Sequence, residues 1–194
     1  MKNKDGLLVV FSGPSGVGKD SLLQRLLEVN PQISLSISAT TRAPRGAEQH
    51  GKDYYFLTKE KFQEIIKQDG MLEHAVYCDN YYGTPRQPVE EGIRQGRDVI
   101  LEIEVQGGAQ VRQKNPASVS IFVLPPSMRV LFQRLHKRGT DSEEVIQKRL
   151  AKAREEIQKA EQYDYVVIND DLEECVQEIC EILSAEKKKA SRSG

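Results

Sequence analysis

The sequence predicts an α/β fold with a parallel core sheet, because short apolar runs alternate with amphipathic segments. The apolar runs lack the apolar–polar alternation of a half-exposed strand, so they suit strands that are buried on both faces. These runs are LLVVF (7–11), DVILEI (98–103), SIFVL (120–124) and YVVI (165–168). The segments expected to be helical are 20–28, 86–95, 127–137, 142–162 and 171–187.

One region, residues 37–84, interrupts this rhythm and is rich in Thr, Arg, Tyr and Gly. Within it, DYYFLT and LEHAVY predict short, half-exposed strands around a helix at 59–68. We interpret the region as an insertion that binds a ligand. A chain of 194 residues can bury one substantial core, so we expect a single domain over 1–194 with smaller insertions.

The composition gives no sign of a nucleic-acid or membrane partner. The 28 Lys and Arg residues balance 29 Asp and Glu residues, so any charge that matters must be local. The first residues, MKNKDG, carry no apolar signal region, and no run approaches the roughly 18 apolar residues of a membrane span. Cys78, Cys175 and Cys180 lack metal-type spacing, which favours reduced thiols. We therefore expect a cytoplasmic protein.

The stretch GPSGVGKDS (13–21) matches the phosphate-binding pattern G-x-x-x-x-G-K-[ST] except at Asp20, where a hydroxyl residue is expected. An expected strand precedes it and SLLQRLLE, with helical spacing of apolar residues, follows it, as the pattern requires. Backbone N–H groups of such a loop converge on phosphate oxygens, and Lys19 can reach the outer phosphates. A glycine turn with a chance lysine is the alternative. The predicted nucleotide-binding residues are Gly13, Pro14, Ser15, Gly16, Val17, Gly18, Lys19, Asp20 and Ser21.

Asp20 allows two interpretations. A carboxylate in the first helical turn stabilises the helix by ~0.3 to 1 kcal/mol, without any catalytic role. Carboxylates also bind Mg²⁺, so Asp20 could hold the metal directly or through water, with the Ser21 hydroxyl beside it. Because a bare anion would repel a triphosphate, we expect the loop to work only with Mg²⁺.

Two arginines of the insertion are suited to hold a phosphate. Arg42 and Arg45 lie three residues apart in the loop SATTRAPRG, and guanidinium groups there can grip a phosphate through two hydrogen bonds. Tyr54 and Tyr82 could add hydroxyl donors. A solvated loop with tyrosines in a small core would explain any one of these residues, but not their concentration in the insertion.

Glu73 in GMLEHAVY is suited to recognise a base, together with Ser38 and Thr84. A carboxylate can accept two hydrogen bonds from adjacent donors, and guanine alone among the common bases presents N1–H beside an exocyclic NH₂. Adenine lacks that pair. A plain charge on a strand surface is the alternative.

Further charged residues follow the expected core strands. Glu102 and Glu104 end the strand of DVILEIEVQG on one side of its pleat, where ligands of open α/β sheets bind or where the strand emerges into solvent. Arg134, Arg138 and Arg149 follow SIFVLPPS. These arginines are either solvent-facing partners of glutamates, worth ~0.2 to 0.5 kcal/mol per pair, or part of a hinged cover that neutralises a transferring phosphoryl group.

Together these motifs resemble guanylate kinase, in order and across nearly the whole chain. The resemblance rests on GPSGVGK, TTRAPRGAEQHGKDYYF, EHAVYCDNYYGTPR, GRDVILEIEVQG, FVLPPS, RGTDSEEVIQKRLAKAREE and YDYVVINDDL. It implies a three-layer P-loop kinase fold with a parallel core sheet, a GMP-binding insertion and a helical lid. The implied activity moves the γ-phosphoryl group of ATP to GMP, and by extension to dGMP, with Mg²⁺. The implied boundaries are a core of 1–36, 87–136 and 158–194, an insertion of about 37–86 and a lid of about 137–157.

The resemblance also implies roles for single residues. The residues expected to contact guanine are Ser38, Glu73 and Thr84, and those expected to hold the GMP phosphate are Arg42, Arg45, Tyr54 and Tyr82. The substrate-binding set is completed by Glu48, Glu102 and Glu104. The residues expected on the ATP side, besides 13–21, are Arg134, Arg138 and Asn169. The catalytic residues would be Lys19, Arg42, Arg138 and Arg149, and the metal ligands Asp20 and Ser21.

Two positions depart from the family pattern. Asp20 replaces the more usual Ser, Thr or Gly, and Glu104 stands where the family usually has Asp, which is one methylene shorter. Both positions belong to the expected metal and substrate region.

Two other functions are compatible with parts of the sequence. Guanylate-kinase-like domains of scaffolding proteins bind phosphopeptides, typically with an eroded phosphate-binding loop, whereas Lys19 and the glycines are intact here. The segment GKDSLL also resembles ribose 1,5-bisphosphate phosphokinases, but Glu73 with TTRAPR and NYYGTP favours guanine. We expect GMP and ATP as small-molecule substrates, no nucleic-acid or membrane partner, and a monomer or small homo-oligomer.

Overall fold

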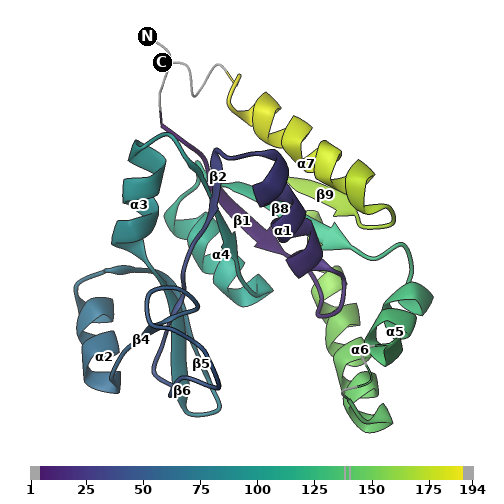
Figure 1. Ribbon diagram of the computed structural model, residues 1–194, viewed down its shortest axis with the longest axis horizontal. Helices are drawn as coiled ribbons and strands as arrows, with labels where there is room; N and C mark the ends of the chain where they lie inside the picture. Colours follow the sequence, from purple (N-terminus) through teal and green to yellow (C-terminus); the bar gives the residue numbers. More distant parts are fainter. Residues whose placement is uncertain (1–4, 138, 140, 190–194) are drawn as a thin grey trace. The chain divides into compact units, whose positions relative to one another are not determined.

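Strand β1 (Leu8–Ser12) belongs to both of the two units into which the chain divides. The computed structural model describes residues 5–137, 139 and 141–189 (Figure 1). Of these, 11–33 and the chain from 119 onward form the first unit, and 5–10 with 34–118 form the second.

The first unit combines parallel strands with four helices. Strands β8 (Val119–Leu124) and β9 (Tyr165–Ile168) are parallel, and the strand order in this unit is β1-β8-β9. The middle of β8 is fully buried, as its apolar run predicts. The helices are α1 (Lys19–Val29), α5 (Met128–Lys137), α6 (Glu143–Ile157) and α7 (Leu172–Glu186), with a 3₁₀ turn at Ala160–Gln162.

Side chains join these helices in pairs. Helices α1 and α7 lie side by side (Figure 1), and Nε of Arg25 donates to the Glu173 carboxylate at 2.8 Å. Helices α5 and α6 share an apolar cluster that includes Leu131, Leu135 and Ile146. The unit thus buries apolar helix faces where the sequence shows helical spacing.

The second unit holds two sheets. In one, the N–H of Leu7 donates to the Asp98 carboxylate at 3.0 Å and the strand order is β2-β7-β1. In the other, the order is β4-β3-β6-β5, with β3 and β4 parallel and the other pairs antiparallel. The strands are β2 (Ile33–Leu35), β3 (Ala39–Thr40), β4 (Tyr55–Phe56), β5 (Met71–Tyr77), β6 (Asn80–Pro85) and β7 (Asp98–Glu102). The helices are α2 (Lys59–Lys67), α3 (Arg86–Arg94) and α4 (Val105–Lys114).

Strands β5 and β6 form a hairpin with an irregular register. The chain turns at Cys78 and Asp79, whose φ angles of 46° and 60° are the left-handed conformation of a tight hairpin turn. The register shifts between Met71 and Glu73, which leaves Leu72 as an extra residue, a β-bulge. As a result, three consecutive side chains, from Met71 to Glu73, are buried.

The predicted α/β class is confirmed, and β1, β7 and β8 are buried over most of their length, as predicted. The prediction that YVVI is buried on both faces was wrong: within β9 only Val167 is buried, whereas Val166 and Ile168 are 42% and 55% exposed, because β9 ends the strand order.

Several other element predictions were incomplete. Strands β2, β3 and β6 and helix α4 were not predicted. Gly107 and Gly108 interrupt the helical pattern of α4, and the strands are short or rich in Tyr and Gly. The helix predicted over 142–162 ends at Ile157. No Gly or Pro marks that end in the sequence. The chain leaves the helix where the buried Tyr163 ring packs against Phe122 of β8, with ring centroids 5.0 Å apart.

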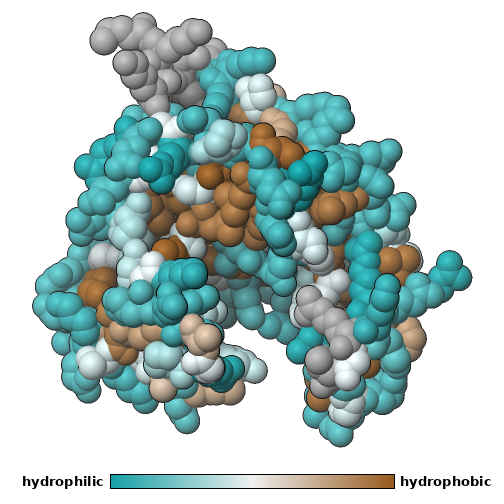
Figure 2. All heavy atoms as spheres, in the orientation of Figure 1, coloured by the Kyte–Doolittle hydropathy of each residue, from teal (hydrophilic) through white to brown (hydrophobic). Residues whose placement is uncertain are grey.

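The visible surface is mostly hydrophilic in Figure 2, in keeping with a chain of 29% charged residues. Among the helices of the described ranges, none is long and apolar enough to span a lipid bilayer. Cys78, Cys175 and Cys180 are free cysteines.

Candidate functional site

The turn between β1 and α1 has the form that a phosphate-binding loop requires. Strand β1 ends at Ser12 and α1 begins at Lys19, so a strand and a helix flank residues 13–18. Gly18 stands directly before the helix with a φ of 98°, and a Cβ there would lie 2.6 Å from Nδ2 of Asn169. Only glycine fits both the backbone conformation and the close approach.

Asn169 and Arg134, two residues predicted to bind ATP, both donate hydrogen bonds to the carbonyl oxygen of Val17 in this loop. Nδ2 of Asn169 donates to it at 2.8 Å and Nη1 of Arg134 donates at 3.0 Å. Nη2 of Arg134 also donates to the Asn169 carbonyl at 2.8 Å. Arg134 has five N–H donors, so these bonds brace the loop without using its full capacity.

Lys19 lies across the same loop. Its Nζ donates to the Gly13 carbonyl at 2.8 Å. The contact sets the ammonium beside the backbone that would receive phosphate oxygens. The structure therefore brings together Lys19, Arg134 and Asn169 around the loop.

Asp20 and Ser21 are exposed on the first turn of α1 and both present oxygen atoms. Mg²⁺ usually binds one or two carboxylates and completes its octahedron with water and substrate phosphates. An exposed carboxylate and hydroxyl beside a phosphate-binding loop fit this type of site. These two residues are also the ones predicted to hold the metal.

Of the arginines predicted for the lid, Arg149 lies on α6. Nη1 of Arg149 is 3.3 Å from Oδ2 of Asp141, with side-chain exposures of 35% and 14%. The pair orients the guanidinium while leaving it accessible. Arg138 lies outside the described residues.

A pocket of about 490 Å³ lies within the second unit, a size that suits a small nucleotide. Eight of the ten predicted substrate-binding residues line it: Ser38, Arg42, Arg45, Tyr54, Glu73, Tyr82, Glu102 and Glu104. A smaller pocket of about 260 Å³ shares Ser38, Tyr54 and Glu102 with it and is also lined by Glu48 and Asp53.

Arg42 is oriented in the larger pocket by Glu48. Its Nη1 and Nη2 donate to the two Glu48 carboxylate oxygens at 2.6 and 2.7 Å, and Nη1 also donates to the Ala43 carbonyl at 3.0 Å. Glu48 accepts a further hydrogen bond from the Arg45 N–H at 2.8 Å. The hydrogen bonds from Arg42 and Arg45 lower the pKa of Glu48 to about 2, and the Glu48 hydrogen bonds raise the pKa of Arg42. Both groups are therefore charged near neutral pH.

A second edge of the Arg42 guanidinium is available. Glu48 occupies the Nη1–Nη2 end, whereas Nε forms no hydrogen bond to any residue that the structure describes. The guanidinium carbon also lies 5.0 Å from the Tyr54 ring centroid and 5.8 Å from that of Phe56, within the range of cation–π attraction. Ion pair and rings together restrict the side chain while its Nε–Nη2 edge can still bind an anion.

Glu73 presents a buried carboxylate to the larger pocket. It is 6% exposed, and the register of β5 and β6 sets Thr84 directly opposite. Oγ1 of Thr84 donates to Oε1 of Glu73 at 2.7 Å. Burial raises the pKa of Glu73, and the hydrogen bond from Thr84 opposes that rise. Thr84 is fully buried and is not part of the pocket lining, so it acts here as the partner of Glu73.

The prediction that Glu102 and Glu104 share one side of a strand was wrong. Strand β7 ends at Glu102, and Glu104 stands at the N-cap of α4. The chain leaves the sheet to start a helix that Gly107 obscured in the sequence. Gln106 and Gly107 also line the pocket but were not predicted; their position directly after a predicted core strand was the available signal.

Comparison with known proteins gives one consistent result. The profile of the family described as guanylate kinase matches residues 5–186. A guanylate kinase of Desulfitobacterium hafniense is 55% identical, covering 99% of this chain and 96% of the relative, and one of Synechocystis sp. is 54% identical, covering 94% and 95%. The crystal structure of guanylate kinase from Anaplasma phagocytophilum is similar with a TM-score of 0.77 at 37% identity, covering 99% of this chain and 92% of that one. The similarity to that structure confirms the predicted P-loop kinase fold.

Proposed function

Because the chain belongs to the guanylate kinase family and transfers a phosphoryl group from ATP to GMP, we propose a division of that reaction between its two units. The second unit would bind GMP in the pocket that Glu73 and Arg42 line. The loop 13–18 of the first unit would bind the phosphates of ATP.

Glu73 would select the base. Its carboxylate oxygens can accept from the N1–H and the exocyclic NH₂ of guanine, a donor pair that adenine lacks. Oε1 keeps a lone pair for the base while it accepts from Thr84. Ser38 in the pocket wall would add a polar contact. A base without the donor pair would leave a buried carboxylate unsatisfied, at a cost of about 1 to 3 kcal/mol.

Arg42 would hold the GMP phosphate by its Nε–Nη2 edge. Glu48 occupies the other end of the guanidinium, so its role would be to orient Arg42 and not to contact the phosphate, which it would repel. The further donors would be Arg45, Tyr54 and Tyr82, which line the same pocket.

The first unit would hold ATP through backbone N–H groups of the loop and through Lys19. Arg134 and Asn169 would keep the loop in shape through their bonds to Val17. Asp20 and Ser21 are the residues that would hold Mg²⁺, which would supply positive charge to the phosphates.

No residue needs to act as a general base. The attacking group is a GMP phosphate oxygen that is already ionised near neutral pH. Catalysis then consists of positioning and of charge neutralisation, which Lys19, Arg138 and Arg149 would provide. This accounts for a site made of arginines, a lysine and backbone amides.

The observation that carries the proposal is a buried carboxylate, Glu73, in the wall of a pocket that also contains Arg42 and Arg45. The test supplies ATP with GMP, dGMP, AMP or ribose 1,5-bisphosphate and measures ADP release. We expect turnover with GMP and dGMP, and at least about 100-fold lower kcat/KM with AMP. A preference for ribose 1,5-bisphosphate, or no turnover with any acceptor, would contradict the proposal.

We further propose that the enzyme works in the cytoplasm on free guanine nucleotides, as a monomer or small homo-oligomer without a nucleic-acid or membrane partner. Size-exclusion chromatography with light scattering checks the oligomeric state.

A further inference from the structure

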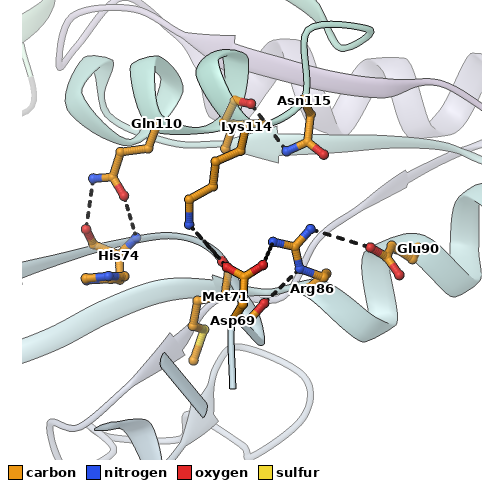
Figure 3. Close-up of polar contacts among 9 residues, drawn as sticks. Asp69, Met71, His74, Arg86, Glu90, Gln110, Lys114 and Asn115 are labelled. Atoms are coloured by element: carbon orange, nitrogen blue, oxygen red, sulfur yellow. Dashed lines mark hydrogen bonds and ion pairs between the residues drawn. The ribbon is translucent and has the colours of Figure 1, made fainter. Parts of the chain in front are cut away.

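One face of α4 runs along β5, the strand that carries Glu73. Gly107, Gln110 and Lys114 are spaced three and four residues apart, so they share that face. Figure 3 shows the Gln110 and Lys114 side chains reaching from α4 to β5. Strand β5 ends the order β4-β3-β6-β5, so no further strand among the described residues pairs with its outer edge.

Gln110 takes the place of a neighbouring strand at this edge. Its Oε1 accepts from the His74 N–H at 3.2 Å, and its Nε2 donates to the His74 carbonyl at 3.0 Å (Figure 3). A carboxamide presents an acceptor and a donor side by side, so it satisfies both polar backbone groups of one residue. His74 directly follows Glu73, which means that the two bonds fix the backbone next to the carboxylate.

Gly107 has no side chain and therefore leaves the space that the Glu73 carboxylate occupies. A Cβ at this position would lie 2.8 Å from Oε2 and 3.2 Å from Cδ of Glu73. Glycine within a helix costs roughly 0.5 to 1 kcal/mol relative to alanine. Here the glycine leaves room for the carboxylate that lines the pocket.

The sheet alone does not determine where Glu73 points. The register shift between Met71 and Glu73 disrupts the ladder directly before this residue, and a bulge turns side chains away from regular alternation. On the other side, Oγ1 of Thr84 donates to Oε1. Helix α4 binds the backbone beside Glu73 and passes so near to Oε2 that a Cβ at Gly107 would crowd it.

We propose that Gly107 and Gln110 are positioning residues for base selection, which hold the Glu73 carboxylate in the place where it discriminates guanine from other bases. This inference rests on the proposed role of Glu73. Lys114 contributes less, because its Nζ lies 3.5 Å from the Met71 carbonyl and 3.7 Å from the Asp69 carboxylate, which Arg86 already binds at 2.9 Å (Figure 3).

The first test measures the kinetics of the Gly107→Ala variant with GMP and with IMP as the acceptor. The atom nearest to the new Cβ is the end of a flexible side chain, so we expect the helix to form and the carboxylate to move. The KM for GMP should rise about tenfold, the loss of roughly one hydrogen bond, while kcat and the KM for ATP change by less than about twofold. IMP lacks the 2-amino group, so the preference for GMP over IMP should fall about tenfold as well.

The second test compares Gln110→Ala with Gln113→Ala. Gln113 is exposed on the same helix and forms no hydrogen bond within the part of the chain that the structure describes, so its variant controls for helix effects. We expect Gln110→Ala to raise the KM for GMP and lower the GMP preference several-fold. Gln110→Glu keeps the acceptor and loses the donor, so its effect should be intermediate.

Two outcomes would overturn the inference. One is a Gly107→Ala variant with wild-type KM for GMP and wild-type preference over IMP; the other is a Gln110→Ala variant that matches Gln113→Ala in both readouts. Failure of the wild-type protein to phosphorylate GMP would instead contradict the proposed function, so the two cases are distinguishable.

Discussion

The predicted phosphate-binding loop and the larger pocket of the second unit are built in different ways. We call the latter the base pocket, after its proposed ligand. The loop is one contiguous stretch, 13–21, shaped by glycines and braced at a single carbonyl by Asn169 and Arg134. The base pocket gathers its lining from residues spread over 38–107. A contiguous site acts mainly through its own backbone, whereas a dispersed site depends on contacts that orient its side chains, such as those of Glu48 with Arg42 and of Thr84 with Glu73.

The largest effect should come from removing the charge of the loop. Lys19→Met keeps the length of the side chain but removes the ammonium that would neutralise the transferring phosphoryl group. Removing one protein group that stabilises a transition state typically lowers kcat about 10²- to 10³-fold, and we expect a fall of that size here. Equilibrium binding of GMP, measured by titration calorimetry, should not change. A comparable loss of GMP binding would show that the two sites are not separable in this way.

The next largest effect should come from Glu73→Gln in the base pocket. The amide replaces one acceptor with a donor facing the guanine N–H groups, so GMP affinity should fall by about 1 to 3 kcal/mol, or ~5- to 150-fold. The KM for ATP should stay near the wild-type value. Unchanged GMP affinity would remove Glu73 as the group that reads the base.

The same variant should be at least as stable as the wild type near neutral pH. Because burial raises the pKa of Glu73, the folded protein binds its proton more tightly than the unfolded chain, whose value is near 4.5. The stabilisation from this proton is complete below pH 4.5 and is lost as the pH rises through the raised pKa. The difference in Tm between Glu73→Gln and the wild type should therefore shift in favour of the variant as the pH rises from 4.5 toward neutral. Thermal scans across that range would check this shift. A constant difference in Tm would contradict this sign.

A smaller effect should follow from freeing Arg42. Without its partner, the guanidinium loses its fixed orientation, so Glu48→Ala should raise the KM for GMP about three- to tenfold, and Glu48→Gln, which keeps one acceptor, should raise it less. A lower KM in Glu48→Ala would mean that the carboxylate competes with the phosphate instead of orienting Arg42. Since the pKa of Glu48 is lowered to about 2, the pair's contribution to stability should be present above pH 4.5 and disappear between pH 4.5 and about 2.

The smallest effect concerns Asp20 at the helix start. If its carboxylate helps to hold Mg²⁺, Asp20→Ala should raise the Mg²⁺ concentration for half-maximal rate, while the free energy of unfolding changes by no more than ~1 kcal/mol. Asp20→Ser restores the hydroxyl of the usual motif and should retain activity if any oxygen ligand suffices. Identical Mg²⁺ titrations of all three proteins would leave Asp20 as a helix-start residue in a working loop.

The contrast between the two sites also explains what could be predicted from the sequence. The loop was predictable because its residues are adjacent and its glycines mark the turn. Glu73 and Arg42 were predictable as side chains of suitable chemistry, but Glu48 as the residue that orients Arg42 was not, because the pairing is set by how the loop folds on itself.

Helix α4 shows the same limit. Its two glycines weaken the helical pattern in the sequence, yet a side chain at Gly107 would crowd the Glu73 carboxylate. The bulge before Glu73 likewise appears only once β5 pairs with β6. Local patterns reveal groups that bind, whereas the residues that hold them in place emerge from tertiary contacts.

A crystal structure of the protein with GMP bound would test the account most directly, because it locates base and phosphate at once. The account predicts guanine N1 and N2 within hydrogen-bond distance of the Glu73 carboxylate, and phosphate oxygens on the Nε–Nη2 edge of Arg42 while Glu48 keeps the Nη1–Nη2 end. A base lying beyond ~3.5 Å from Glu73, or a phosphate that displaces Glu48 from Arg42, would contradict it.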